Sequence, residues 1–198
     1  FTLIGMGGSI LGSKAIYSFL KEKIKKNFIF IDNLIFKNMN FKKKNKKNLN
    51  LIISKSGNTL ETIANLNVLS KNKQKNIFIT ERKDSYLKIL ANKLQSEIIE
   101  HNNFIGGRYS VLSEVGMLPA SLMGFNVKKF RKFNDLIRNK NFINSLIFNV
   151  SSTLELVNKK KFNSIILNYD ERSSDLFAWY QQLIAESLGK KGKGILPV

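Results

Sequence analysis

Short apolar runs alternate with longer amphipathic stretches along most of the chain. The apolar runs predict strands at residues 1–4, 28–31, 49–53, 77–80, 96–99 and 162–167. The amphipathic stretches predict helices at residues 9–25, 59–71, 85–94, 110–123, 127–139, 144–159 and 174–188. Strands that alternate with helices favour a mainly parallel sheet that is covered on both faces.

The predicted fold class is therefore α/β, a three-layer αβα sandwich with a mainly parallel sheet. A helical segment and the start of a second α/β unit follow it, which gives predicted divisions at 1–125, 126–160 and 161–198. Runs 28–31 and 51–53 are continuously apolar, as interior parallel strands are. Right-handed crossovers would bring the loops after the strands to one edge of the sheet.

The composition excludes several classes of protein. Hydrophobic residues make up 43% of the 198 residues, which is ample for a folded core and unlike a disordered chain. No apolar run reaches the roughly 18 residues that a membrane span needs, so we expect no membrane partner. The absence of cysteine excludes disulfides and thiolate chemistry and fits a reducing compartment.

The net charge of +19 has two interpretations, a nucleic-acid partner or a lysine-rich solvated surface. The densest basic run, residues 42–47, lacks the interleaved aromatic residues that stack on bases. We favour the solvated surface and expect no nucleic acid to bind. The excess charge would still draw anionic substrates toward a cleft.

A glycine-rich segment, residues 5–9 (Gly-Met-Gly-Gly-Ser), follows the first predicted strand and opens a helix. Glycine lets a ligand approach the backbone closely, and a helix N-terminus favours an anion. The alternative is a tight turn with Ser9 as the helix N-cap.

A hydroxyl-rich segment, residues 54–59 (Ser-Lys-Ser-Gly-Asn-Thr), follows the third predicted strand. Hydroxyls, amide groups and a helix dipole in one loop suit a phosphate monoester. Ser54, Ser56 and Thr59 supply the hydroxyls, and Lys55 adds a positive charge. Helix capping by Asn58 or Thr59 is the alternative.

An arginine follows two glycines at residues 106–110 (Gly-Gly-Arg-Tyr-Ser), after the fifth predicted strand. The glycines leave room for a substrate beside the Arg108 guanidinium, and Ser110 could cap the next helix. A surface arginine on a turn is the alternative.

Glu186 lies on the last predicted helix, beside the apolar stretch 179–184, which predicts that this helix is buried. Burial disfavours the charged form of a carboxylate, which would suit a general base near neutral pH. The alternative is an ordinary ion pair with Lys190, four residues along the helix. His101, the single histidine, is interpreted as a polar residue at a strand end. No cluster has the spacing of a metal site.

The four segments resemble the phosphoglucose isomerase family, with its paired sugar isomerase (SIS) domains. The match runs through residues 5–9, 54–62, 106–113 and 182–190. The resemblance implies reversible isomerisation of glucose 6-phosphate to fructose 6-phosphate through a cis-enediol, a reaction of glycolysis and gluconeogenesis. It also implies a cytoplasmic homodimer that binds a hexose 6-phosphate and needs no cofactor or metal.

The resemblance assigns roles to particular residues. Catalytic roles fall on Glu186, the base that moves the proton, and on Arg108, beside the enediol. Substrate-binding roles fall on Gly8, Ser9, Ser54, Lys55, Ser56, Thr59 and Gly107. A ring-opening histidine of the partner subunit and a C-terminal lysine have no counterpart here, and His101 does not stand in that motif. We therefore expect a fragment of a longer protein, inactive alone.

The sequence departs from the family pattern at Ile10, Ser13 and Asn58. Three further functions stay open beside isomerisation of glucose 6-phosphate: a non-catalytic sugar-phosphate sensor, a related aldose–ketose isomerase, and a nucleic-acid-binding module for which only the charge argues. A sensor would need the phosphate loop but no base, so Arg108 and Glu186 favour an enzyme.

Overall fold

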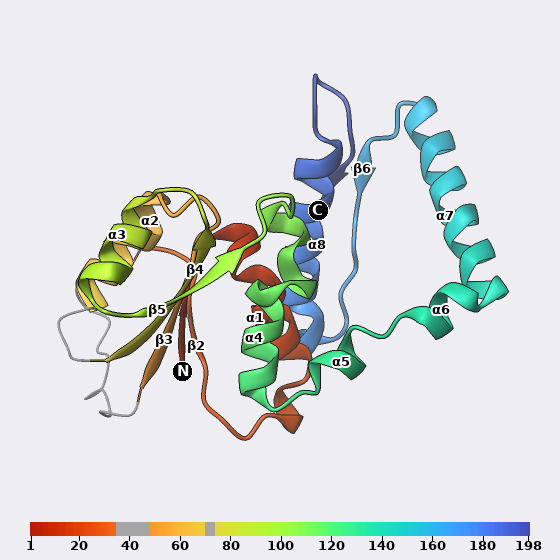
Figure 1. Cartoon of the computed structure of the whole chain (residues 1–198). Coiled ribbons are helices and arrows are strands. Elements are labelled where there is room, and N and C mark those ends of the chain that lie inside the picture. The colour runs from red at the N-terminus through yellow and green to blue at the C-terminus, as the bar shows by residue number, and fades with distance from the viewer. Residues whose placement is uncertain (35–47, 70–73) are drawn as a thin grey trace.

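The computed structural model describes residues 1–34, 48–69 and 74–198. Its main sheet has five parallel strands in the order β2-β1-β3-β4-β5 (Figure 1). They are β1 (Thr2–Ile4), β2 (Ile29–Ile31), β3 (Leu49–Ile53), β4 (Lys75–Glu81) and β5 (Glu97–His101). The predicted α/β class and the parallel sheet are confirmed.

The α-helices of the described residues lie between and after the strands. They are α1 (Leu11–Phe19), α2 (Leu60–Leu69), α3 (Tyr86–Lys93), α4 (Glu114–Met123), α5 (Val127–Phe130), α6 (Asn134–Arg138), α7 (Lys140–Asn158) and α8 (Ser174–Leu188). Short 3₁₀ turns are η1 (Gly7–Ser9), η2 (Lys21–Lys23), η3 (Gly107–Leu112) and η4 (Glu171–Ser173). The basic run at 42–47 lies outside the described residues.

Helices cover both faces of the sheet (Figure 1). Successive side chains of a strand point to opposite faces. In β3, Leu51 and Ile53 therefore pack with residues of α1 and α4, whereas Ile52 packs with residues of α2 and α3. All three side chains are buried, and each contributes roughly 1.5–3 kcal/mol to folding. The chain thus builds the three layers that its alternating pattern predicts.

The strand order creates a switch point between β1 and β3. From β1 the chain moves to β2 on one side, and from β3 it moves to β4 and β5 on the other. Ligands of open parallel sheets bind outside the carboxyl ends of the strands at such a point. The loops that begin at Gly5 and Ser54 leave the sheet there.

Two predictions from the sequence, one about a strand and one about a helix, are wrong. Strand β2 lies at the edge of the sheet rather than in its interior, and Ile29 is 48% exposed. The predicted helix at 127–139 is interrupted after Phe130, so α5 and α6 are short and separate. An apolar run reports that a strand packs against something, but it does not distinguish an interior strand from an edge.

The C-terminal part of the chain contains a short strand pair and a helix that packs against the first unit. Strands β6 (Asn163–Ser164) and β7 (Leu196–Pro197) form a separate parallel pair, much shorter than the predicted strand at 162–167. Helix α8 lies beside α1 of the first unit (Figure 1). Lys14 of α1 pairs with Asp175 of α8 at 3.4 Å and with Asp32 at 2.8 Å, which ties α8 to the main sheet. The division at 1–125, 126–160 and 161–198 stays a prediction.

Helix α7 stands apart from the layers, and none of its residues is buried (Figure 1). Of the helices in the described ranges, none combines the length and the apolarity that crossing a membrane requires.

Candidate functional site

The glycine-rich turn after β1 is packed tightly against two other elements. A side chain on Gly8 would collide with the backbone of Gly107 and Arg108. Gly7 has a φ of +52°, and a Cβ there would lie 2.6 Å from Nε2 of Gln182 in α8. Glycine at both positions therefore lets η1, η3 and α8 meet. Ser9 ends η1, and the side-chain cap of α1 predicted from it is absent.

Alanine at position 8 tests this close approach. We expect Gly8→Ala to lower the free energy of unfolding of the full-length protein by about 1–3 kcal/mol, because overpacking forces backbone shifts. The matched control is Gly107→Ala, since a Cβ at Gly107 meets no atom within 4 Å. Urea denaturation measures both. Equal stability of the two variants would show that the loops do not need this contact.

The hydroxyl-rich loop is held by its own polar groups. The Oγ of Ser54, which is buried, lies 2.8 Å from the Oγ1 of Thr59 and accepts from the Gly57 amide at 3.2 Å. Ser56 is exposed and accepts from the Asn58 amide at 3.3 Å. The loop thus presents the exposed Ser56 hydroxyl, which accepts from the Asn58 amide, and a linked pair of hydroxyls.

The loop is also where α2 begins. The Thr59 carbonyl accepts from the Ile63 amide, so the first amides of α2 follow directly. These amides have no partner within their own helix, and the helix dipole favours a negative charge beside them. Asn58, the other predicted cap, accepts from the Tyr86 amide at 2.9 Å and so serves α3. The N-terminus of α2 remains suited to an anion.

Lys55 links this loop to the segment that precedes Arg108. Its Nζ donates to the carbonyls of Asn103 at 2.8 Å and Ile105 at 2.9 Å, and it pairs with Glu81 at 3.3 Å. The ammonium is therefore engaged by protein groups. Direct phosphate contact by Lys55 stays a prediction, whereas its role as a bridge between two loops is visible.

The arginine turn is fastened to the glycine turn. The Oγ of Ser110, which is buried, is 2.6 Å from the Gly107 carbonyl and 3.2 Å from the Gly8 carbonyl. Capping of α4, which the sequence assigned to Ser110, is done by Ser113, whose Oγ accepts from the Val115 amide. Ser110 therefore holds the two turns together.

Arg108 and Glu186, 78 residues apart, lie side by side. The Arg108 Nη1 is 3.4 Å from the Glu186 Oε2, and the Gln182 Nε2 donates to the Glu186 Oε1 at 2.8 Å. Arg108 Nε also donates to the Ser187 Oγ at 2.9 Å. The partner of Glu186 is thus Arg108 rather than Lys190. A guanidinium beside a carboxylate places an anion-stabilising group next to a base.

Tyr109 completes the surroundings of the guanidinium. Its hydroxyl is 2.8 Å from the Ser187 Oγ, and the Arg108 guanidinium lies 4.9 Å from its ring centroid. The pKa of Arg108 is raised, first by its hydrogen bond with Tyr109 and further by the charge of Glu186. The pKa of Tyr109 is lowered, first by its hydrogen bond with Ser187 and then by that with Arg108.

The predicted burial of Glu186 is wrong. Its side chain is 49% exposed, and α8 contains no buried residue. Helix α8 packs against α1, and this contact leaves its apolar residues only partly buried. In this chain the carboxylate is positioned by Arg108 and Gln182 rather than by an apolar environment. Reasoning from the sequence missed Gln182 as a partner of Glu186, and it missed Tyr109 and Ser187 as partners of Arg108, although each stands within a predicted motif.

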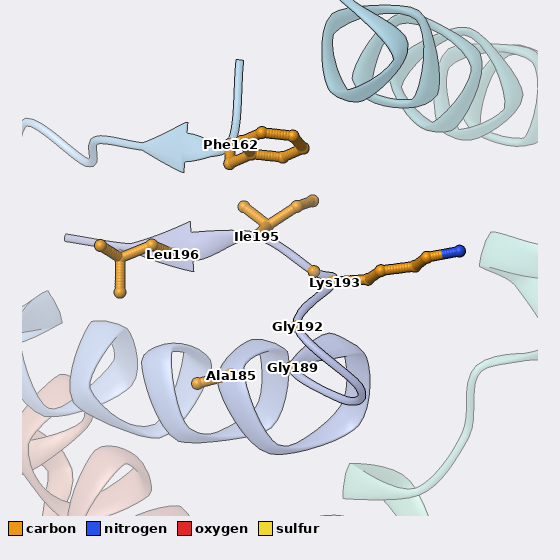
Figure 2. Close-up of a pocket in the computed structure, with 8 residues that line it drawn as sticks. Phe162, Ala185, Gly189, Gly192, Lys193, Ile195 and Leu196 are labelled. Carbon is orange, nitrogen blue, oxygen red and sulfur yellow. The ribbon is translucent and has the colours of Figure 1, made fainter. Parts of the chain in front are cut away.

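A separate hollow of about 370 Å³ lies between α8 and the β6–β7 pair (Figure 2). Phe162, Ile195 and Leu196 line it above Ala185, and the Lys193 side chain extends away from them. It contains none of the predicted site residues. Within the described ranges, no group of three metal-ligating side chains comes together.

Solved structures define the class of the fold. The tagatose-6-phosphate ketose/aldose isomerase of Escherichia coli matches 99% of this chain and 54% of its own, with a TM-score of 0.63 and 16% identity. A hypothetical protein of Thermus thermophilus matches 100% of this chain and 52% of its own, with a TM-score of 0.82 and 29% identity. The fold is that of SIS-like isomerases.

The particular family follows from sequence comparison. The family model described as phosphoglucose isomerase matches residues 2–194, and the chain belongs to that family. The glucose-6-phosphate isomerases of Methanocaldococcus jannaschii and Acholeplasma laidlawii are 36% and 34% identical over 99% and 98% of this chain. The chain spans about half the length of these curated relatives, 52% and 51%.

Proposed function

We propose that the protein interconverts glucose 6-phosphate and fructose 6-phosphate through a cis-enediol. The observation that carries this proposal is the 3.4 Å approach of the Arg108 guanidinium to the Glu186 carboxylate at the joined glycine turns. Family membership supports it. We further propose a homodimer in the cytoplasm that serves glycolysis and gluconeogenesis, with a hexose 6-phosphate as its ligand and no cofactor or nucleic acid.

The reacting end of the sugar would lie between Arg108 and Glu186. The Glu186 carboxylate takes the proton from C2 of the open-chain aldose and returns it to C1. The proton of the C2 hydroxyl passes to O1, so that C2 becomes the ketone and C1 the alcohol. A positioned base contributes about 10²–10⁴-fold to such a step. The partial exposure of Glu186 leaves a face on which a substrate can bind.

Arg108 would stabilise the oxygen that becomes negative in the enediolate. Its guanidinium is already oriented by Ser187 and Tyr109, so little reorganisation accompanies the reaction. Gly8 and Ser9, with Gly107, would shape the sugar-binding surface beside it. The packing of Gly8 on Gly107 supports this, because it brings both turns to one place.

The phosphate would bind at the hydroxyl-rich loop, through Ser54, Ser56 and Thr59 and the first amides of α2. Binding at this remote end orients the sugar for proton transfer at the other end. Ring opening is not assigned to His101, because that side chain is buried and both of its ring nitrogens contact protein atoms.

A labelled substrate tests the proposal. We expect the full-length protein to convert glucose 6-phosphate deuterated at C2 into fructose 6-phosphate, with part of the deuterium at C1 and the rest in water. Mass spectrometry of the product measures both. If the protein binds the sugar phosphate but the deuterium stays at C2, the protein is a sensor. If it turns over another aldose phosphate faster than glucose 6-phosphate, it is a related isomerase.

A further inference from the structure

His101 is a buried titratable side chain that the proposed reaction does not use. It ends β5, and its side chain is 1% exposed. Its Nδ1 contacts the Glu114 Oε1, and its Nε2 lies 3.1 Å from the Ile105 carbonyl. A buried imidazole with partners on both nitrogens is fixed in one orientation.

The chemistry of these partners defines where one hydrogen lies. A carbonyl oxygen can only accept, so the Nε2 of His101 carries the hydrogen that it donates to Ile105. The Nδ1 of His101 contacts the Glu114 carboxyl group. Glu114 is the first residue of α4, where the helix dipole favours a negative side chain. His101 therefore joins the end of β5 to the start of α4.

The Ile105 carbonyl has a second donor, the Nζ of Lys55 at 2.9 Å. One backbone atom thus receives a hydrogen bond from the hydroxyl-rich loop and another from the buried histidine. The amide of Ile105 donates to the Asn102 carbonyl, which closes a turn just before the two glycines and Arg108. The position of this turn determines where the segment to Arg108 begins.

We propose that His101 is a positioning residue for Arg108. By donating to the Ile105 carbonyl and pairing with Glu114, it fixes the segment 102–107 that carries the guanidinium to Glu186. Through Lys55 the same carbonyl couples that segment to the hydroxyl-rich loop. This inference rests on the proposed function, since Arg108 and Glu186 are taken there as the reacting pair.

Two substitutions of His101 separate its two contacts. The amide of His101→Gln reaches the place of Nε2 and can still donate to Ile105, whereas the amide of His101→Asn reaches only the place of Nδ1, beside Glu114. In the full-length protein, His101→Asn should lower kcat for isomerisation by about 10²-fold with little change in KM, because misplacement by about 1 Å costs that much. His101→Gln should stay within about 10-fold of wild type.

Hydrogen exchange supplies a readout that does not depend on activity. The amides of residues 102–109 should exchange faster in His101→Asn than in wild type and stay protected in His101→Gln. Phe28→Leu serves as the control for a general loss of packing, because Phe28 is buried next to β2, before the amino end of that strand. It should leave both kcat and the exchange of this segment unchanged.

The outcomes are distinguishable. If His101→Asn and His101→Gln have the same kcat and the same exchange rates at residues 102–109, the positioning role is overturned. If the wild-type protein fails to isomerise the sugar, the proposed function fails, and the exchange experiment still decides whether His101 fixes the segment. If His101→Asn does not fold while His101→Gln does, the fold requires the hydrogen bond from His101 to the Ile105 carbonyl and not the contact with Glu114.

Discussion

Replacing Glu186 with Gln in the full-length protein should lower kcat for isomerisation by about 10²–10⁴-fold, the usual contribution of a positioned base. Glutamine keeps the shape of the side chain and can still meet Gln182 and Arg108, but its amide cannot take a proton from C2. Binding of the sugar phosphate should stay nearly intact, because the hydroxyl-rich loop is unchanged. Steady-state kinetics and calorimetric titration with fructose 6-phosphate measure the two effects.

Glu155→Gln is the matched control for this substitution. Glu155 is an exposed carboxylate of α7, paired with Lys159 four residues along the same helix. It should retain wild-type kcat. A Glu186→Gln variant that remains fully active would remove Glu186 from the mechanism and require another base.

Arg108→Met should raise the activation barrier by about 2.7–4 kcal/mol, the cost of removing one oxyanion donor. This corresponds to a loss in kcat of roughly 10²–10³-fold. Methionine fills similar space but carries neither the charge nor the planar donors that face Glu186 and Ser187. Arg108→Lys should recover only part of the lost activity, because an ammonium cannot donate to Glu186 and to Ser187 with the planar geometry of a guanidinium.

The control here is Arg82→Met, since the Arg82 side chain is 88% exposed and pairs only loosely with Glu100, at 3.8 Å. It removes the same charge from the protein and should leave kcat unchanged. A loss of activity in Arg82→Met as large as that in Arg108→Met would mean that overall charge, and not the positioned guanidinium, controls the rate.

Elements with strong local patterns were predictable. The sequence predicts the strand at 49–53 with the bounds that β3 has, because the apolar run 51–53 after a polar segment defines a buried strand locally. Strand β6 was overestimated, since Ile165 and Leu167 lie exposed at 69% and 73%. An apolar run records a tendency to be buried, but burial needs a partner surface, which sequence does not specify.

In the site, too, local features were predictable and contacts between distant residues were not. The residue types and their order along the chain indicate a phosphate loop, an arginine and a carboxylate. The bond from Ser110 to the Gly8 carbonyl and the bridge from Lys55 to Ile105 could not be predicted. Each joins residues 50 or more positions apart, and their orientation depends on how the loops pack.

The sequence by itself determined the αβα class, the family and the identity of the residues that could do the chemistry. These follow from local periodicity and from motifs that are read along the chain. Only the tertiary structure decided that Glu186 is half exposed and faces Arg108, and that His101 supports the turn before it. The physical reason is that burial and hydrogen-bond partners depend on which distant surfaces meet, and the crossover connections and side-chain packing of the whole domain decide this.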